Sequence, residues 1–250
     1  AANNTAVGYN SLTANTTGTT NTAVGANALD ANTTASQNTA VGYNALTATT
    51  TGAANTAVGF GALDANTTAS NNTAVGTSAL TANTTGTLNV AVGANSLQQN
   101  TTASDNTALG VNALIANTTG ASNTGLGRAA LAANTTAVNN TAVGYFALLA
   151  NTTGASNVAV GASTLDANIT GANNVAIGAS ALTNDTKGNK SVAIGTNALN
   201  NQNFTSATDS LNVAVGHRAG VAVTSGTQNT LIGGLAGDSI TTGNRNTILG

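Results

Sequence analysis

One short repeat dominates the sequence. The pentapeptide Asn-Thr-Ala-Val-Gly occupies residues 4–8 and returns with small changes throughout the chain. Its copies start at Asn4, Asn21, Asn38, Asn55, Asn72, Asn89, Asn106, Asn123, Asn140, Asn157, Asn174, Ser191, Asn212, Asn229 and Asn246. Every interval is 17 residues except the one from Ser191 to Asn212, which is 21. A fixed short period predicts a solenoid, in which each coil buries its apolar face only against neighbouring coils.

Fixed columns emerge when the residues of each coil are numbered from its first Asn. Position 2 is Thr or Val, position 3 is nearly always Ala, and position 4 is Val, Leu or Ile. Position 9 is Leu in the first twelve coils, and positions 12–14 mostly read Asn-Thr-Thr. This pattern predicts a short strand over positions 2–4, with positions 2 and 4 on one face and position 3 on the other.

Position 5 is Gly in every coil, which suits a turn with positive φ or a close approach of neighbouring backbones. These predicted turn glycines include Gly8, Gly25, Gly42, Gly59, Gly76, Gly93, Gly110, Gly127, Gly144, Gly161, Gly178, Gly195, Gly216 and Gly233. A 17-residue coil has room for two short strands and two turns, but not for a helix as well. The predicted fold is therefore all-β, a parallel β-solenoid or β-roll of about fifteen 17-residue coils.

The repeat pattern also predicts how the chain is organised. We expect a single repeat solenoid over residues 1–250, with regular coils over residues 4–211. The coil 191–211 carries a four-residue insertion, which we expect to form a surface loop. Residues 212–250 form divergent coils in which Gly220 and Gly237 replace the Leu of position 9, and we expect the coils to continue beyond the sequence.

A single coil is too small to fold alone. It would bury a Val, a Leu and several Ala, which is too little to offset the conformational entropy lost on ordering its residues. Stacking must supply the difference, and the Asn at position 1 is expected to hydrogen-bond to its own copy in the next coil. Because the strand carries Ala where a solvent-facing residue would be polar, we expect a partner chain to cover the outer face.

Composition excludes several classes of function. Only 5% of residues are charged and the net charge is −2, which argues against nucleic-acid binding and against a basic membrane-binding patch. No apolar run is long enough for a membrane-spanning helix, so no membrane insertion is expected in this segment. The absence of Cys leaves no thiolate metal site. We expect no cofactor.

Few residues could carry catalysis or bind a metal. His217 is the only histidine, and a hydrolytic triad would need Ser210 and Asp209 beside it. The alternative, which we favour, is that His217 simply occupies position 6 of its coil. Asp30, Asp64 and Asp166 share position 10, but alternate coils are too far apart to share one calcium ion. We therefore predict no catalytic residue and no metal site.

Position 6 is the candidate contact surface. It accepts Tyr, Phe, Arg, Thr and Ala, which indicates that it faces outward. Exposed aromatic rings there would form a receptor or glycan contact, although packing of the rings over a turn is the simpler interpretation. The inserted loop, residues 203–209, is a second candidate. The candidate contact residues are Tyr9, Tyr43, Phe60, Arg128, Tyr145, His217 and, in the loop, Phe204.

The Thr columns at positions 13 and 14 suggest an alternative function, ice binding or ordering of surface water. A flat, regular array of Thr could order water to match a lattice. Adjacent residues on a strand point to opposite faces, however, so each face would gain only one Thr column. A face with two such columns would be a stronger signal.

Two segments carry a resemblance to known families. Residues 190–195, Lys-Ser-Val-Ala-Ile-Gly, resemble the SVAIG-type repeat of trimeric autotransporter adhesin heads. Residues 38–46, Asn-Thr-Ala-Val-Gly-Tyr-Asn-Ala-Leu, resemble repeats of bacteriophage tail fibres. The resemblance implies a left-handed β-roll, with three chains around one axis forming a rigid, non-enzymatic rod. It also implies an extracellular location, on a virion tail or a bacterial surface, and a glycan or protein receptor as partner.

Overall fold

The computed structural model describes all residues, 1–250. The chain contains seventeen short β-strands and no helix, so no helix could span a membrane. Its contacts divide it into two compact parts, residues 1–122 and residues 123–250, which are described separately.

The strands follow the repeat. The first part contains β1 (Thr5–Val7), β2 (Thr22–Val24), β3 (Thr39–Val41), β4 (Thr56–Val58), β5 (Thr73–Val75), β6 (Val90–Val92) and β7 (Thr107–Leu109). The second part contains β8 (Thr124–Leu126), β9 (Thr141–Val143), β10 (Val158–Val160), β11 (Val175–Ile177), β12 (Gly188–Asn189), β13 (Val192–Ile194), β14 (Thr208–Asp209), β15 (Val213–Val215), β16 (Thr230–Ile232) and β17 (Thr247–Leu249).

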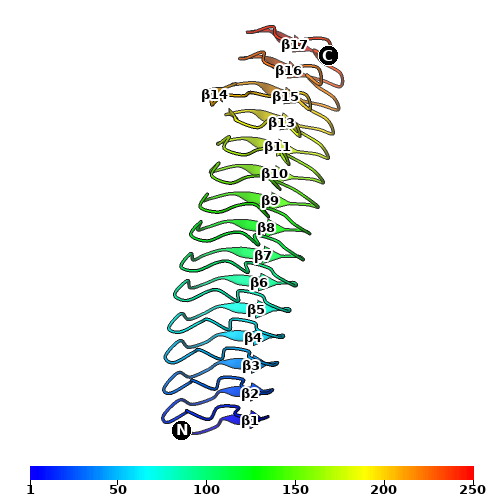
Figure 1. Ribbon diagram of the computed structural model, residues 1–250. Coiled ribbons are helices and arrows are strands. Elements are labelled where there is room, and N and C mark those ends of the chain that lie inside the picture. Colours follow the sequence, from blue (N-terminus) through cyan, green and yellow to red (C-terminus); the bar gives the residue numbers. More distant parts are fainter. The chain divides into compact units, whose positions relative to one another are not determined.

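Within each part the coils stack in parallel and in register. Thr39 of β3 pairs with Thr56 of β4, and Val158 of β10 pairs with Val175 of β11, so identical positions of successive coils lie side by side. Figure 1 shows this stacking within each part, with one strand of the main sheet on the same side of every coil. The predicted parallel β-solenoid is confirmed.

Each coil contributes one three-residue strand, not the two that we expected. The exception is the pair β12 and β14, which lies beside the insertion. Elsewhere, backbone hydrogen bonds link successive coils without forming regular strands. The N–H of Leu63, for example, donates to the carbonyl oxygen of Ala79 (3.0 Å), and the N–H of Ala65 donates to that of Thr81 (3.0 Å). Turns can therefore carry much of the stacking that a second strand would have supplied.

The two faces of the strand differ in burial. From the second coil to the fourteenth, the residue at position 3, such as Ala57, is buried, whereas the residues at positions 2 and 4, such as Thr56 and Val58, are half-exposed or exposed. The predicted alternation is confirmed, but the two faces are reversed: the expectation that each coil buries its Val, with Ala on the outer face, is wrong. The interior beside the strand admits only a methyl group, so the larger aliphatic side chain points outward.

Leucine fills the interior of the first twelve coils, with an unusual backbone. Leu63 and Leu80 at position 9 are completely buried, and both have φ of 52°. A left-handed backbone costs about 1–2 kcal/mol for a residue with a Cβ. Burial of a leucine side chain, at about 1.5–3 kcal/mol, offsets that cost.

The last coils rearrange this interior. Gly220 and Gly237 have no side chain at position 9, and a Cβ on Gly220 would lie 2.7 Å from Cδ1 of Leu231. Leu231 occupies position 3, where all earlier coils have Ala or Gly, and Val223 occupies position 12 in place of Asn. The large aliphatic group has moved to a different wall of the coil, while the strand register is kept.

Candidate functional surface

Buried asparagines at position 1 tie successive coils together. Oδ1 of Asn72 accepts hydrogen bonds from the backbone N–H of Asn89 (3.0 Å) and from its amide group (3.2 Å). Nδ2 of Asn72 donates to the carbonyl oxygen of Gly86 (2.9 Å). The expected link between each Asn and its own copy is therefore present, and it uses mainly the backbone N–H.

A second buried ladder runs through the side chains of position 12. Nδ2 of Asn83 donates to Oδ1 of Asn66 (3.2 Å), and Nδ2 of Asn100 donates to Oδ1 of Asn83 (2.9 Å). Where the next coil lacks an Asn, the ladder stops. The coil after Asn32 has Thr49 at position 12, and the coil after Asn168 has Asp185 there. The Oδ1 atoms of Asn32 and Asn168 are both buried without a hydrogen-bond partner.

The insertion is anchored more firmly than a surface loop would be. Phe204 is only 7% exposed, so its prediction as a surface contact is wrong. The four extra residues give the chain enough slack for this side chain to turn inward, while the residues from Thr205 to Ala207 stay exposed. Only the exposed residues of the loop remain available to a partner.

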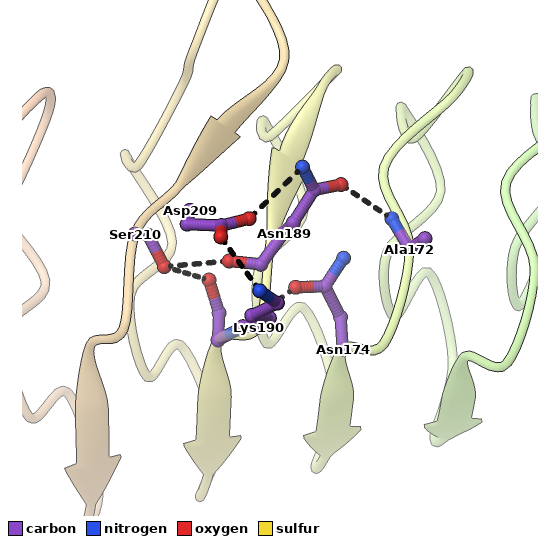
Figure 2. A network of polar contacts seen from close by, with 7 residues as sticks. Ala172, Asn174, Asn189, Lys190, Asp209 and Ser210 are labelled. Atoms are coloured by element: carbon purple, nitrogen blue, oxygen red, sulfur yellow. Dashed lines mark hydrogen bonds and ion pairs between the residues drawn. The ribbon is translucent and has the colours of Figure 1, made fainter.

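Polar contacts hold the base of this loop (Figure 2). Nζ of Lys190 lies 2.6 Å from Oδ2 of Asp209, and the Lys190 ammonium group lowers the pKa of the Asp209 carboxyl. The hydroxyl of Ser210 donates to the carbonyl oxygen of Asn189 (3.2 Å), and its oxygen lies 2.5 Å from that of Ser191. The ion pair is exposed, so it contributes little to stability.

Asp185 is a fully buried carboxyl next to this loop. Its Oδ1 accepts hydrogen bonds from the N–H groups of Gly188 (2.9 Å) and Phe204 (3.2 Å), and its Oδ2 accepts one from Nε2 of Gln202 (2.6 Å). Burial raises the pKa of the Asp185 carboxyl above its ordinary value, because desolvation outweighs these three bonds.

This raised pKa predicts a pH-dependent stability. The folded chain holds the Asp185 proton more tightly than the unfolded chain, so the contribution of Asp185 is most favourable below its ordinary pKa and is lost as pH rises through the raised value. Asp185→Asn is therefore expected to gain stability relative to the unmodified protein as pH rises from about 3 to neutrality. Thermal unfolding midpoints across that range measure this difference.

Two features make this pH test specific. Asp64 and Asp166 also have raised pKa values from burial, but they are present in both proteins and cancel in the difference. Asp238→Asn, which removes an exposed carboxyl of the same part, controls for the lost negative charge. A difference between the Asp185 variant and the unmodified protein that does not change with pH would contradict the prediction.

Position 6 faces outward, as predicted. Tyr9, Tyr43, Phe60 and Tyr145 are among the most exposed large side chains, and Arg128 and His217 are also exposed. In the first part the rings of Tyr43 and Phe60 stack with their centroids 5.4 Å apart. Their packing does not cover them, so they remain available for contact.

A second aromatic pair lies in the second part. The rings of Tyr145 and Phe146 stack at 3.9 Å, and Cζ of Arg128 lies 5.8 Å from the Tyr145 centroid. Phe146, which occupies position 7, is not among the contact residues predicted from the sequence. An aromatic residue directly after Tyr145, in a column mostly of Asn and Ser, was the available signal.

None of the other predicted residues belongs to a metal-ligating cluster or a pocket. No group of three or more His, Cys, Asp or Glu side chains could hold a metal ion, and the structure has no pocket. The turn glycines lie where predicted, with φ near +140° at Gly59 and Gly42. The sequence matches no protein-family model, no curated protein and no solved structure.

In each part of the chain, the outer face of the sheet carries two columns of side chains. The side chains at position 2 are Thr or Val, and those at position 4 are Val, Leu or Ile. Those at position 4 are half-exposed or exposed in every coil, and the more exposed ones after the first coil are Leu109, Leu126, Ile177, Ile232 and Leu249. We call these two columns the outer sheet face.

Proposed function

We propose that this chain is a structural, non-enzymatic segment of an extracellular fibre, the shaft or head of a virion tail fibre or of a bacterial adhesin. Three copies associate through their outer sheet faces. The chain supplies a stiff repeated scaffold on which receptor-contact side chains are displayed at position 6. The resemblance of its repeats to those of tail fibres and trimeric adhesin heads supports the same role.

The observation that carries this proposal is the outer sheet face itself. Each strand of the main sheet carries an aliphatic residue at position 4, and the outer sheet face holds no charged residue in either part of the chain. Soluble monomers rarely expose an apolar surface that continues over so many elements. Association of chains would remove this column from water and supply burial that the small interior of each coil lacks.

This proposal makes a prediction about oligomeric state. The unmodified chain is expected to sediment at about three times its 23.9 kDa mass at micromolar concentration. Replacing Val41 and Val58 by Lys would place two ammonium groups at the contact between chains, where they would lose solvation without gaining partners. We expect the double variant to sediment as a monomer in analytical ultracentrifugation.

The matched control places the same charges elsewhere on the same coils. Thr34 and Thr51 are exposed residues at position 14, away from the outer sheet face, and their replacement by Lys is expected to leave the trimer intact. A monomeric unmodified chain would contradict the proposal. So would a control variant that dissociates as readily as the Val41 and Val58 variant.

The Thr hydroxyls of the outer sheet face favour a second candidate function, the ordering of water or ice. The Thr column at position 13 is poorly suited to it, because hydroxyls such as those of Thr50 and Thr84 donate to backbone carbonyl oxygens of the next coil. The hydroxyls of Thr39 and Thr56, on the outer sheet face, make no hydrogen bond within the chain. Thermal hysteresis by a monomeric chain would favour this alternative.

A further inference from the structure

Three side chains of the second part form one exposed cluster. Arg128 and Tyr145 occupy position 6 of successive coils, and Phe146 follows at position 7. Cζ of Arg128 lies 5.8 Å from the centroid of the Tyr145 ring and 6.0 Å from that of the Phe146 ring. The two rings stack with their planes inclined by 27°, so each covers one face of the other, and the exposed part of Tyr145 remains as an apolar surface beside a cation.

The charge of Arg128 has no counterion within the chain. The structure contains a single salt bridge, between Lys190 and Asp209, and Arg128 is held only against the two rings. A guanidinium group presents five donors in a planar fork that matches a carboxylate. Contact with ring faces leaves the edge of that fork free to bind an anion.

The backbone at Phe146 adds an independent observation. Phe146 has φ of 58°, in the left-handed region, where most coils of the second part carry small or polar residues such as Ser163 and Asn197. The left-handed backbone recurs at position 7 of the other coils, so it belongs to the turn, and what is particular to this coil is the bulky ring that it holds against Tyr145.

Nothing bulky covers the cluster from the following coil. Position 6 of that coil is Ala162, which is exposed, and Tyr145 is itself 46% exposed. The cluster is therefore shallow and open. It suits the projecting end of a surface polymer rather than a small molecule that must be enclosed.

We infer that this cluster binds an acidic saccharide. The C–H face of the sugar ring lies on the exposed Tyr145 ring, which Phe146 supports from behind, and the sugar carboxylate accepts two hydrogen bonds from Arg128. A nucleic acid is disfavoured because one cation cannot neutralise a run of phosphates. The inference deepens the proposed function, since it names the class of receptor that the fibre segment contacts.

The test uses a pair of sugars that differ only in the acidic residue. Sialyllactose and lactose are titrated against the full chain, with binding followed by ligand-observed NMR, and trigalacturonate serves as a second acidic probe. We expect at least one acidic probe to bind and lactose to show no binding. Arg128→Gln is expected to weaken binding of the acidic probe about tenfold or more, as for loss of a charge-assisted hydrogen bond.

Two controls match the chemistry of the site. Arg218→Gln removes an exposed arginine of the same part that lies over no ring, and Tyr43→Ala removes the stacked ring pair of the first part, which has no cation beside it. Both are expected to keep full affinity. The inference is overturned if neither acidic probe binds, if lactose binds equally well, or if Arg218→Gln weakens binding as much as Arg128→Gln.

Sedimentation of the same samples keeps the two proposals distinguishable. Arg128 lies outside the outer sheet face, so Arg128→Gln is expected to leave the oligomeric state unchanged. A trimer that binds no acidic saccharide would overturn this inference alone. A monomer that binds sialyllactose through Arg128 would overturn the proposed fibre assembly alone.

Discussion

Replacing Gly59 by Asn is expected to destabilise the first part of the chain by at least about 4 kcal/mol. Gly59 has φ of 140°, which residues with a Cβ rarely adopt. A Cβ at this residue would also lie 2.5 Å from the carbonyl oxygen of Gly76 and 2.7 Å from its carbonyl carbon. Both are backbone atoms of the next coil, so no side-chain rotation can relieve the collision.

The same substitution two residues later provides the control. Gly61 has φ of 61°, and a Cβ there would meet no atom within 4 Å. Its column holds Asn in the two preceding coils, where Nδ2 of Asn27 donates to Oδ1 of Asn44 (3.0 Å). Gly61→Asn is therefore expected to change stability by no more than about 1 kcal/mol.

Urea denaturation followed by circular dichroism measures both variants, and hydrogen exchange locates the damage. The N–H of Gly76 donates to the carbonyl oxygen of Val58 (2.8 Å), so its exchange should accelerate in the Gly59 variant and stay slow in the Gly61 variant. Equal stability of the two variants would show that the close approach of neighbouring backbones is not required.

The second large effect is expected at the buried Asn column. Asn72→Ala would leave the buried backbone N–H of Asn89 without its partner, and the carbonyl oxygen of Gly86 would keep only the hydrogen bond from Nδ2 of Asn83 (2.9 Å). A buried unpaired group costs about 1–3 kcal/mol, and the cavity adds to this, so we expect a loss of about 2–4 kcal/mol. The column is structural, and its amides satisfy backbone groups that no neighbouring strand reaches.

The adjacent asparagine is the natural comparison. Asn71 is exposed, and its position is occupied by Ala54 in the preceding coil with a similar left-handed backbone. Asn71→Ala is expected to change the free energy of unfolding by no more than about 1 kcal/mol in the same urea titration. If both Ala variants cost the same, the stabilising role assigned to the Asn72 hydrogen bonds is wrong.

Much of the fold could be predicted from the sequence because each coil has nearly the same residues and therefore makes the same contacts with its neighbours. In-register parallel stacking follows from the fixed interval, and the glycine column was expected to lie where the backbones approach. The outward direction of position 6 was also predictable, since a column that accepts both Arg128 and Tyr145 cannot lie in an apolar interior.

The rest depended on side-chain volumes and on the length of the inserted segment, neither of which can be read from the repeat pattern. Ala57 and Val58 are both apolar, and only the narrow interior decides that the smaller one is buried. Leucine is not a typical left-handed residue, so the conformation of Leu63 could not be expected from preference. Phe204 turned inward because the inserted segment is long enough to fold back onto Asp185.

Pairing of identical positions has a further consequence for how such chains change over generations. Recombination between misaligned copies of the repeat would add or remove 17 residues at a time, and the new junction would reproduce contacts that already exist, such as those between Thr56 and Thr73. Length would then vary in whole steps without redesign of the interior. The two successive coils that contain Asp185 and Phe204 would be the exception, because the contact between these residues is found only once.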